Sequence, residues 1–155
     1  MARTEYFEDP AAPKPNRLIP AASGVVADAE GRVLLIRRTD NEFWTIPGGA
    51  MEPGEDIATC CRREVFEESG IEVEITRLVG IYSNPRHVVA YSDGEVRQQF
   101  SVCFACRPIG GTPTTSDESS EVGFYTATEI AEKNIHPSIR LRIADFWKGS
   151  EPVIG

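Results

Sequence analysis

Three glutamates in the middle of the chain have the spacing of a metal-binding face. Glu64, Glu67 and Glu68 lie in a segment that predicts a helix, with Asp56 as N-cap and Gly70 at its end. At about 100° per residue the three carboxylates share one helical face. They repel one another, and they lie in the half of the helix where its dipole disfavours anions. Bound Mg²⁺ or Mn²⁺ would remove this conflict. The alternative interpretation is an acidic face in contact with solvent.

The residues just before this helix favour the metal interpretation. Gly48 and Gly49 have no side chains, so a loop carbonyl there can approach a metal ion closely. Glu55 and Arg63 have opposite charges and could form an ion pair. Such a pair would tie the loop to the helix and fix the position of the carboxylates.

The complete segment resembles the signature of the Nudix hydrolases. It reads Gly49, five residues, Glu55, seven residues, and then Arg63-Glu64-Val65-x-Glu67-Glu68-x-Gly70-Ile71, with every fixed position matched. The resemblance extends over most of residues 20–147. It implies an α+β fold, in which a mixed β-sheet forms an α/β/α sandwich. It also implies hydrolysis of a nucleoside diphosphate linked to a moiety X.

The resemblance also implies roles for individual residues. The carboxylates of Glu64, Glu67 and Glu68 and the carbonyl of Gly48 correspond to metal ligands. These would hold two or more Mg²⁺ ions, or Mn²⁺, when substrate is bound. Structural and orienting roles fall to three further residues, Gly49, Glu55 and Arg63.

A further carboxylate is expected from the acidic loop before a late strand. Glu118 is favoured over Glu121 as metal ligand or general base, because its spacing to Phe124 resembles the usual placement. Glu64 or Glu67 could serve as the base instead.

The substrate-binding residues are less well defined. An arginine near the end of a strand could clamp a phosphate, and an aromatic ring could stack on a base. The candidates are Arg37, Arg38, Arg97 and Trp44, with Arg86, Phe43 and Tyr82 as weaker ones. His87 and His136 are interpreted as structural, with His87 the better functional candidate of the two.

Three functions fit these motifs. The leading one is Mg²⁺-dependent cleavage of an NDP-linked compound, such as ADP-ribose or a nucleotide sugar, into a nucleoside monophosphate and phosphorylated X. The second is a pyrophosphatase for noncanonical or oxidised nucleoside triphosphates. The third is a non-catalytic module that senses a nucleotide, which the complete set of box glutamates disfavours.

Composition limits the partners and the location. With 16 basic and 24 acidic residues among 155, the net charge is −8, which argues against a nucleic-acid-coating protein. No apolar run approaches the roughly 20 residues that span a bilayer. The expected location is the cytoplasm, with a small nucleotide as partner. Cys60, Cys61, Cys103 and Cys106 are expected to be packing thiols, although the last two have C-x-x-C spacing.

The pattern of apolar residues predicts one domain over residues 18–149, with an extended arm at 1–17 and a tail at 150–155. A second copy of the chain is a candidate partner for the arm, as a homodimer. Hairpins are predicted from 23–27 with 32–37, and from 87–91 with 96–106. A strand is predicted over 71–82 and a long loop over 109–121. Helices are expected to begin near Thr126 and Pro137.

Overall fold

The computed structural model of the chain describes residues 3–149 and 151–155. Residues 1, 2 and 150, which belong to the predicted arm and tail, lie outside the described residues. The elements are β1 (Arg3–Phe7), β2 (Arg17–Val26), β3 (Val33–Arg38), β4 (Trp44–Thr45), β5 (Gly48–Ala50), α1 (Ile57–Ser69), β6 (Ile71–Tyr82), β7 (His87–Tyr91), β8 (Val96–Gly111), β9 (Ser119–Tyr125), α2 (Ala127–Ala131), α3 (Pro137–Lys148) and β10 (Val153–Ile154).

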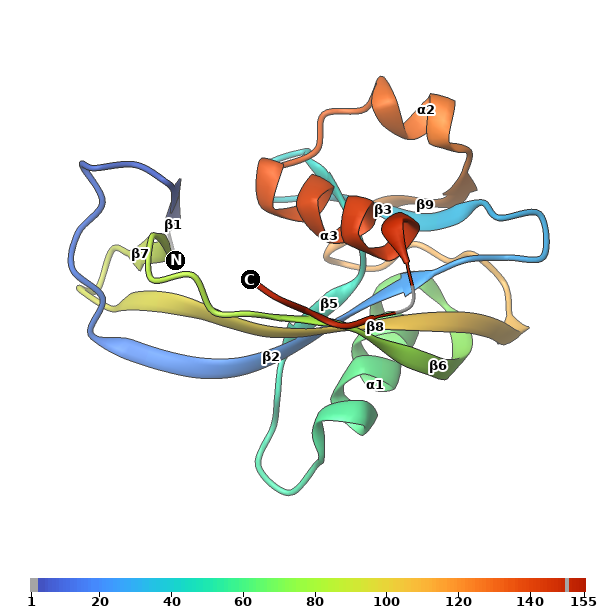
Figure 1. Cartoon of the computed structure of the whole chain (residues 1–155), viewed down its shortest axis with the longest axis horizontal. Coiled ribbons are helices and arrows are strands. Elements are labelled where there is room, and N and C mark those ends of the chain that lie inside the picture. Colours follow the sequence, from blue (N-terminus) through green and yellow to red (C-terminus); the bar gives the residue numbers. More distant parts are fainter. Residues whose placement is uncertain (1–2, 150) are drawn as a thin grey trace.

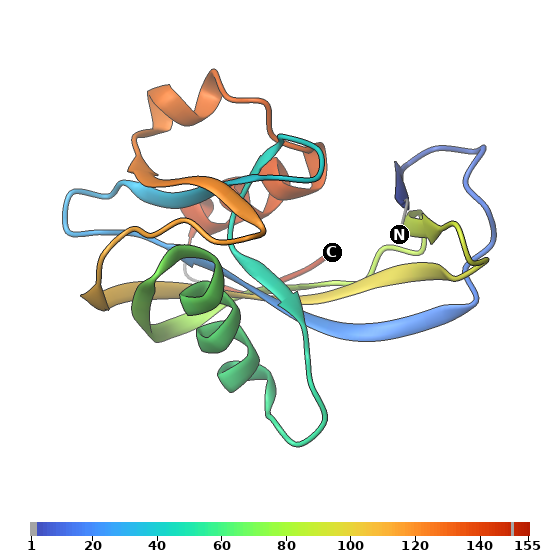
Figure 2. The same ribbon diagram turned by 180° about the vertical axis from the view of Figure 1, so that it is seen from behind.

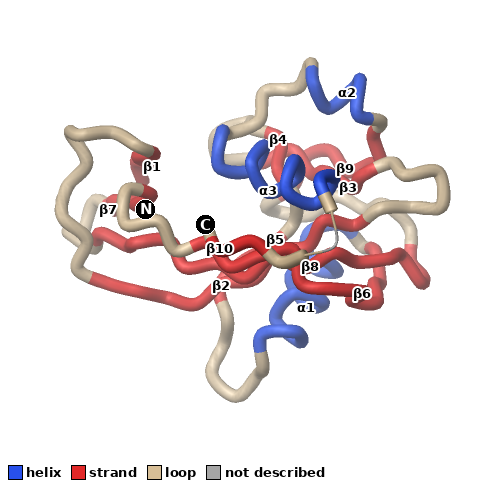
Figure 3. The backbone as a smooth tube through the Cα atoms, viewed as in Figure 1, coloured by secondary structure: helices blue, strands red, loops and turns tan. Residues whose placement is uncertain are grey.

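These elements form three layers around a mixed sheet. Within the described residues the large sheet has the order β1-β7-β8-β2-β5, with β6 paired to β8 and β10 to β6. Strands β2 and β8 run parallel, whereas β6 and β8 are antiparallel. Helix α1 covers one side of this sheet, and α2, α3 and the small sheet β4-β3-β9 lie on the other (Figures 1 and 2). Figure 3 shows the same view with helices, strands and loops in different colours. The predicted α/β/α sandwich is confirmed.

Helix α1 begins and ends where its capping residues predict. The Asp56 carboxylate accepts a hydrogen bond from the Thr59 N–H at 2.8 Å, and Gly70 ends the helix in the left-handed conformation at φ 76°. The buried face of α1 packs Cys60, Cys61 and Val65 against the sheet. Glu68 is also among the buried residues of α1, so the carboxylates begin at the border of this packed face.

Strands β2 and β3 do not form the predicted hairpin. They are bridged at Ala27 and Val33 and then diverge into different sheets. Strand β3 pairs instead with β4 and β9. Its residues 33–36 are all buried, because both of its faces are covered. A run buried on both faces has no alternation that would reveal its partner.

The predicted loop at 109–121 is shorter than expected. Strand β8 continues to Gly111, paired with Ile71 at the start of β6, and β9 already begins at Ser119. The long antiparallel pairing with β6 extends β8 through residues whose composition favours a turn. The connection between β8 and β9 therefore consists of residues 112–118.

The cysteines are free thiols in the core, as expected. Cys103 packs in the cluster beneath α3, whereas Cys106 packs in the cluster beneath α1. The two side chains thus lie on opposite faces of β8 and cannot share a ligand. The C-x-x-C spacing is a consequence of strand packing.

Residues 3–7 form strand β1, which pairs antiparallel with β7 of the same chain. The chain itself therefore supplies a partner for this part of the N-terminal segment. Strands β1 and β7 rise from one end of the large sheet on the side that carries α3 (Figure 1). None of the helices in the described part of the chain is long and apolar enough to cross a membrane.

Candidate active site

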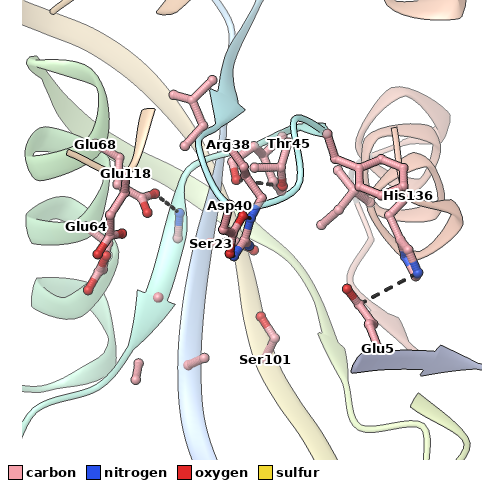
Figure 4. A pocket seen from close by; sticks show the side chains of 18 of the residues that line it. Glu5, Ser23, Arg38, Asp40, Thr45, Glu64, Glu68, Ser101, Glu118 and His136 are labelled. Carbon is pink, nitrogen blue, oxygen red and sulfur yellow. Dashed lines mark hydrogen bonds and ion pairs between the residues drawn. The ribbon is translucent and has the colours of Figure 1, made fainter. Parts of the chain in front are cut away.

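A cavity of about 710 Å³ lies on the α3 side of the large sheet. Its walls come from β1, the segment Arg38–Ala50, one edge of α1, the loop before β9, and α3. Figure 4 shows that it has two ends: Glu64, Glu68 and Glu118 lie together at one, and Glu5 and His136 at the other. Arg38, Asp40 and Ser23 lie between them. The cavity volume is typical of a site for a small molecule.

The three glutamates of α1 all line this cavity. Glu68 is buried, with 9% of its surface exposed, and Glu64 is half-buried. Glu67 is more exposed. Their spacing of three and four residues on one helix places the carboxylates along the edge that faces β5.

Arg63 connects the carboxylates to the preceding loop. Its guanidinium binds Glu55 twice, at 2.6 and 2.9 Å, and donates to the Ala50 carbonyl at 3.0 Å. The same group reaches Glu64 at 2.8 Å and Glu67 at 3.2 Å. The bidentate pair with Arg63 lowers the pKa of Glu55 to about 2. The bidentate pair thus ties the loop before α1 to the helix that carries the carboxylates.

At positions 48 and 49 other groups approach the place that a side chain would occupy. A Cβ on Gly49 would lie 2.5 Å from the carboxyl group of Glu64. A Cβ on Gly48 would lie 2.5 Å from the Ala22 carbonyl oxygen of β2. The Gly48 N–H donates to Glu68 at 2.8 Å, so the glycine segment and the helix carboxylates are in direct contact.

The carboxylates at this end carry an unfavourable concentration of negative charge. Burial and the nearby charges of Glu64 and Glu118 raise the pKa of Glu68 to about 8, although the Gly48 N–H opposes this shift. Burial also raises the pKa of Glu64, together with repulsion from Glu67 and Glu118. Charges of this kind favour a bound cation.

Of the two loop acids considered, only Glu118 is among the residues that line the cavity. Its backbone carbonyl accepts from the Thr39 N–H at 3.1 Å. The neighbouring Ser119 hydroxyl donates to the Glu68 carbonyl at 2.6 Å, which ties the loop to the end of α1. Glu121 instead forms an ion pair with Arg37 at 3.0 Å.

The structure places three of the four substrate-binding candidates in the cavity wall. Arg38, Arg97 and Trp44 line it, whereas Arg37 does not. Arg38 is held by Asp40 through two hydrogen bonds of 2.6 and 2.8 Å. Arg97 pairs with Glu95 and lies over the ring of Tyr91.

The weaker candidates divide in the same way. Phe43 lines the cavity, but Tyr82 and Arg86 do not. Tyr82 is a core residue whose hydroxyl donates to Asp145 at 2.8 Å. Arg86 pairs with Glu8 at 2.6 Å.

Sequence reasoning missed the far end of the cavity. The carboxylate of Glu5 forms a hydrogen bond with His87 Nε2 at 2.6 Å. It also lies 3.8 Å from His136 Nε2. The imidazole rings of the two histidines stack on each other. All three line the cavity, so the two histidines are not simply core residues. This cluster depends on β1, whose pairing with β7 no local pattern revealed.

Arg142 was missed as well. It lines the cavity from α3 and is 7% exposed. Its spacing to Ile139, Ile143 and Phe146 places it on the apolar face of the helix, which is a signal that the sequence did carry.

The residues at the glutamate end fit a divalent cation. The donor set is carboxylate oxygen with a nearby backbone carbonyl, which suits hard ions such as Mg²⁺. Arg63 pairs with Glu64 and Glu67, whereas burial and the neighbouring charges of Glu64 and Glu118 raise the pKa of Glu68.

Comparison with known proteins gives a consistent result. The family model described as "NUDIX domain" matches residues 17–146. A MutT-like protein of Streptomyces ambofaciens is 38% identical over 133 residues, which is 85% of this chain and 79% of that protein. An ADP-ribose pyrophosphatase of Methanocaldococcus jannaschii is 31% identical over 71% of this chain and 63% of its own length.

Solved structures share the fold. A NUDIX hydrolase from Nitrosomonas europaea superposes with a TM-score of 0.72 at 22% identity, covering 88% of this chain and 93% of the other. Most of the chain lies within the family match, and the match includes every glutamate placed at the carboxylate end of the cavity. The chain belongs to the NUDIX family and is a Nudix hydrolase.

Proposed function

We propose that the protein is a Mg²⁺-dependent pyrophosphohydrolase of nucleoside diphosphates linked to a moiety X, releasing a nucleoside monophosphate and phosphorylated X. The observation that carries this proposal is the meeting of Glu64, Glu68 and Glu118 beside the Gly48–Gly49 segment, at one end of a long cavity. The relative named ADP-ribose pyrophosphatase supports this substrate class.

The chain's own residues divide the work of the reaction. Glu64, Glu67, Glu68 and the Gly48 carbonyl would hold the divalent ions, and Glu55 with Arg63 keeps them in position. The bound ions would neutralise the diphosphate oxygens and lower the pKa of an attacking water. Glu118 faces the same space and is the candidate to orient that water or accept its proton.

The remaining part of the substrate would extend toward α3. Arg38 lies between the two ends of the cavity and can contact a phosphate oxygen. Trp44 and Phe43 offer aromatic surface in the wall against which a base or sugar can pack. A cavity of about 710 Å³ has room for groups on both sides of the diphosphate.

The alternative is hydrolysis of noncanonical or oxidised nucleoside triphosphates. A relative in Bacillus subtilis named putative 8-oxo-dGTP diphosphatase, 32% identical over 62 residues, supports it. Its match covers 40% of this chain and 42% of that protein. We favour the NDP-X reaction because the cavity continues well beyond the carboxylate end.

A substrate screen with product identification tests the proposal. We expect ADP-ribose or a nucleotide sugar to be turned over with Mg²⁺ and to yield two monophosphates. The Glu67→Gln and Glu68→Gln variants should lose about 10²–10³-fold in kcat. Glu132→Gln is the matched control, because this exposed acid at the C-terminal end of α2 does not line the cavity.

Two results would contradict the proposal. Faster turnover of every triphosphate than of every NDP-X compound would support the alternative reaction. Full activity of the Glu67→Gln and Glu68→Gln variants would contradict the roles assigned to the box glutamates. Hydrolysis in ¹⁸O-labelled water would also identify which phosphorus is attacked.

A further inference from the structure

Four arginines line the cavity, and three of them already have an acidic partner. Arg3 pairs with Glu5, Arg38 with Asp40, and Arg97 with Glu95. The fourth is Arg142, whose guanidinium forms no hydrogen bond or ion pair with any residue that the structure describes. Its Nε is buried without a partner.

No acidic side chain in the described part of the chain forms an ion pair with Arg142, although the charge of Glu5 favours its ionised form. The guanidinium lies 5.0 Å from the ring of Tyr82, so one of its faces has an aromatic contact. Asp145, one turn further along α3, accepts a hydrogen bond from the hydroxyl of Tyr82 and forms none with Arg142. Glu5, at the far end of the cavity, is already bonded to His87. Burial lowers the pKa of Arg142, which reflects the cost of keeping this charge away from water.

An uncompensated charge at this position works against folding. Removing an ion from water costs several kcal/mol unless a partner offsets it. Arg142 occupies the helix face that also carries Ile139 and Ile143, where an apolar side chain would avoid this cost. The Nε of Arg142 therefore lacks, among the described residues, the partner that would offset this cost.

The position of Arg142 in the cavity wall suggests the partner that is missing. Arg142 lines the same cavity as the glutamates, but it comes from α3, whose N-cap is His136. In Figure 4, His136 lies at the end of the cavity opposite Glu64, Glu68 and Glu118. A substrate whose diphosphate is held at the glutamate end would extend toward this side. The planar fork of arginine matches a carboxylate or a phosphate through two parallel hydrogen bonds.

We infer that Arg142 forms a subsite for a second oxyanion, a carboxylate or a phosphate, carried by the substrate beyond the diphosphate that is cleaved. This inference rests on the proposed function and narrows it to NDP-linked compounds with an additional negative group. The neutral hydroxyls of a plain sugar would leave the guanidinium without a charged partner. A substrate with a plain sugar would bind less tightly than one with an anionic group, because it would leave the buried guanidinium without a counter-charge.

Pairs of compounds that differ by one anionic group test this inference. UDP-glucuronic acid and UDP-glucose differ by a carboxylate on the sugar, and NADPH and NADH differ by a phosphate on a ribose. For at least one pair, we expect the anionic member to have a kcat/KM about tenfold higher or more. The pair that shows the preference identifies whether the subsite takes a carboxylate or a phosphate.

Variants of α3 connect the preference to this residue. Arg142→Met should bring the ratio within the pair close to one, and Arg142→Lys should restore part of it. Arg140→Met is the matched control on the same helix, because Arg140 donates to the backbone carbonyls of Ile130 and Lys133 and does not line the cavity. It should keep the preference of the unchanged protein.

Thermal unfolding gives a readout that does not require turnover. The anionic member of the pair should raise the melting temperature more than the neutral member, and Arg142→Met should remove this difference. Without nucleotide, Arg142→Met should melt at or above the temperature of the unchanged protein. A purely structural arginine would give a lower melting temperature when replaced.

The outcomes separate this inference from the proposed function. Equal kcat/KM and equal stabilisation within both pairs would overturn the subsite, even if the compounds are hydrolysed. An unchanged ratio in Arg142→Met would overturn it as well. Absence of hydrolysis with a stabilisation difference that depends on Arg142 would instead contradict the proposed reaction and retain the subsite.

Discussion

The backbone N–H of Gly48 donates a 2.8 Å hydrogen bond to the carboxylate of Glu68. This contact joins the residue whose carbonyl is the expected backbone ligand to the most buried glutamate of α1. It leaves the other carboxylate oxygen of Glu68 without such a donor, among the charges of Glu64 and Glu118. The contact therefore positions the carboxylate of Glu68 without neutralising it.

Divalent ions should stabilise the folded protein through these carboxylates. Mg²⁺ at about 100 times its dissociation constant would add about 2.7 kcal/mol to the free energy of unfolding. For a chain of this length, this corresponds to a rise in melting temperature of roughly 5–10 °C. Differential scanning calorimetry with Mg²⁺, and again after addition of EDTA, measures the effect.

The Glu68→Gln variant separates this linkage from a general salt effect. Without metal, it should melt at or above the temperature of the unchanged protein, because a carboxylate whose pKa is raised destabilises the fold at neutral pH. Its response to Mg²⁺ should be much smaller. An equal Mg²⁺ response in both proteins would contradict the assignment of Glu68 as a ligand.

The two glycines before α1 should respond differently to alanine. In Gly49→Ala the new methyl group meets the flexible end of Glu64, so the side chain moves and activity falls at least tenfold with a small loss of stability. In Gly48→Ala the methyl group meets the backbone of β2, which cannot move easily. This variant should lose about 1–3 kcal/mol of stability. Urea unfolding and turnover measured on both variants distinguish the two effects.

The site near α1 could be predicted from the sequence because its parts are local. The cap at Asp56, the stop at Gly70 and the spacing of the glutamates all lie within one helix and its preceding loop. The far end of the cavity depends on contacts between residues about 80 positions apart, such as Glu5 with His87. No periodicity reports such a pairing, and the buried strand β3 likewise gave no indication of its partners.

Glu5 should make the stability of the N-terminal strand depend on pH. Burial opposes its ionisation, but the hydrogen bond with His87 and the charge of His136 dominate and lower the pKa of Glu5 from 4.5 to about 2. A carboxylate with a lowered pKa stabilises the fold above its unfolded pKa, and this contribution is lost as the pH falls from about 4.5 to 2. The loss in Glu5→Gln should be about 3 kcal/mol at most at pH 6 and about half of that at pH 3. Urea unfolding at both values measures it, and a penalty independent of pH would contradict the assignment.

Glu118 and Glu121 provide a paired test of the loop carboxylate. Both are exposed acids near the start of β9, but Glu118 lines the cavity, whereas Glu121 pairs with Arg37 outside it. Glu118→Gln should therefore lower kcat by about 10²-fold or more, as expected for the loss of a general base or a metal-binding oxygen. Glu121→Gln should change kcat less than twofold, because Glu121 does not line the cavity. Its exposed ion pair with Arg37 contributes at most about 1 kcal/mol, and this contribution is to the stability of the fold. If Glu121→Gln were the inactive variant, the β9 loop would have to rearrange when substrate binds. If both variants kept full turnover, the base would be one of the glutamates on α1.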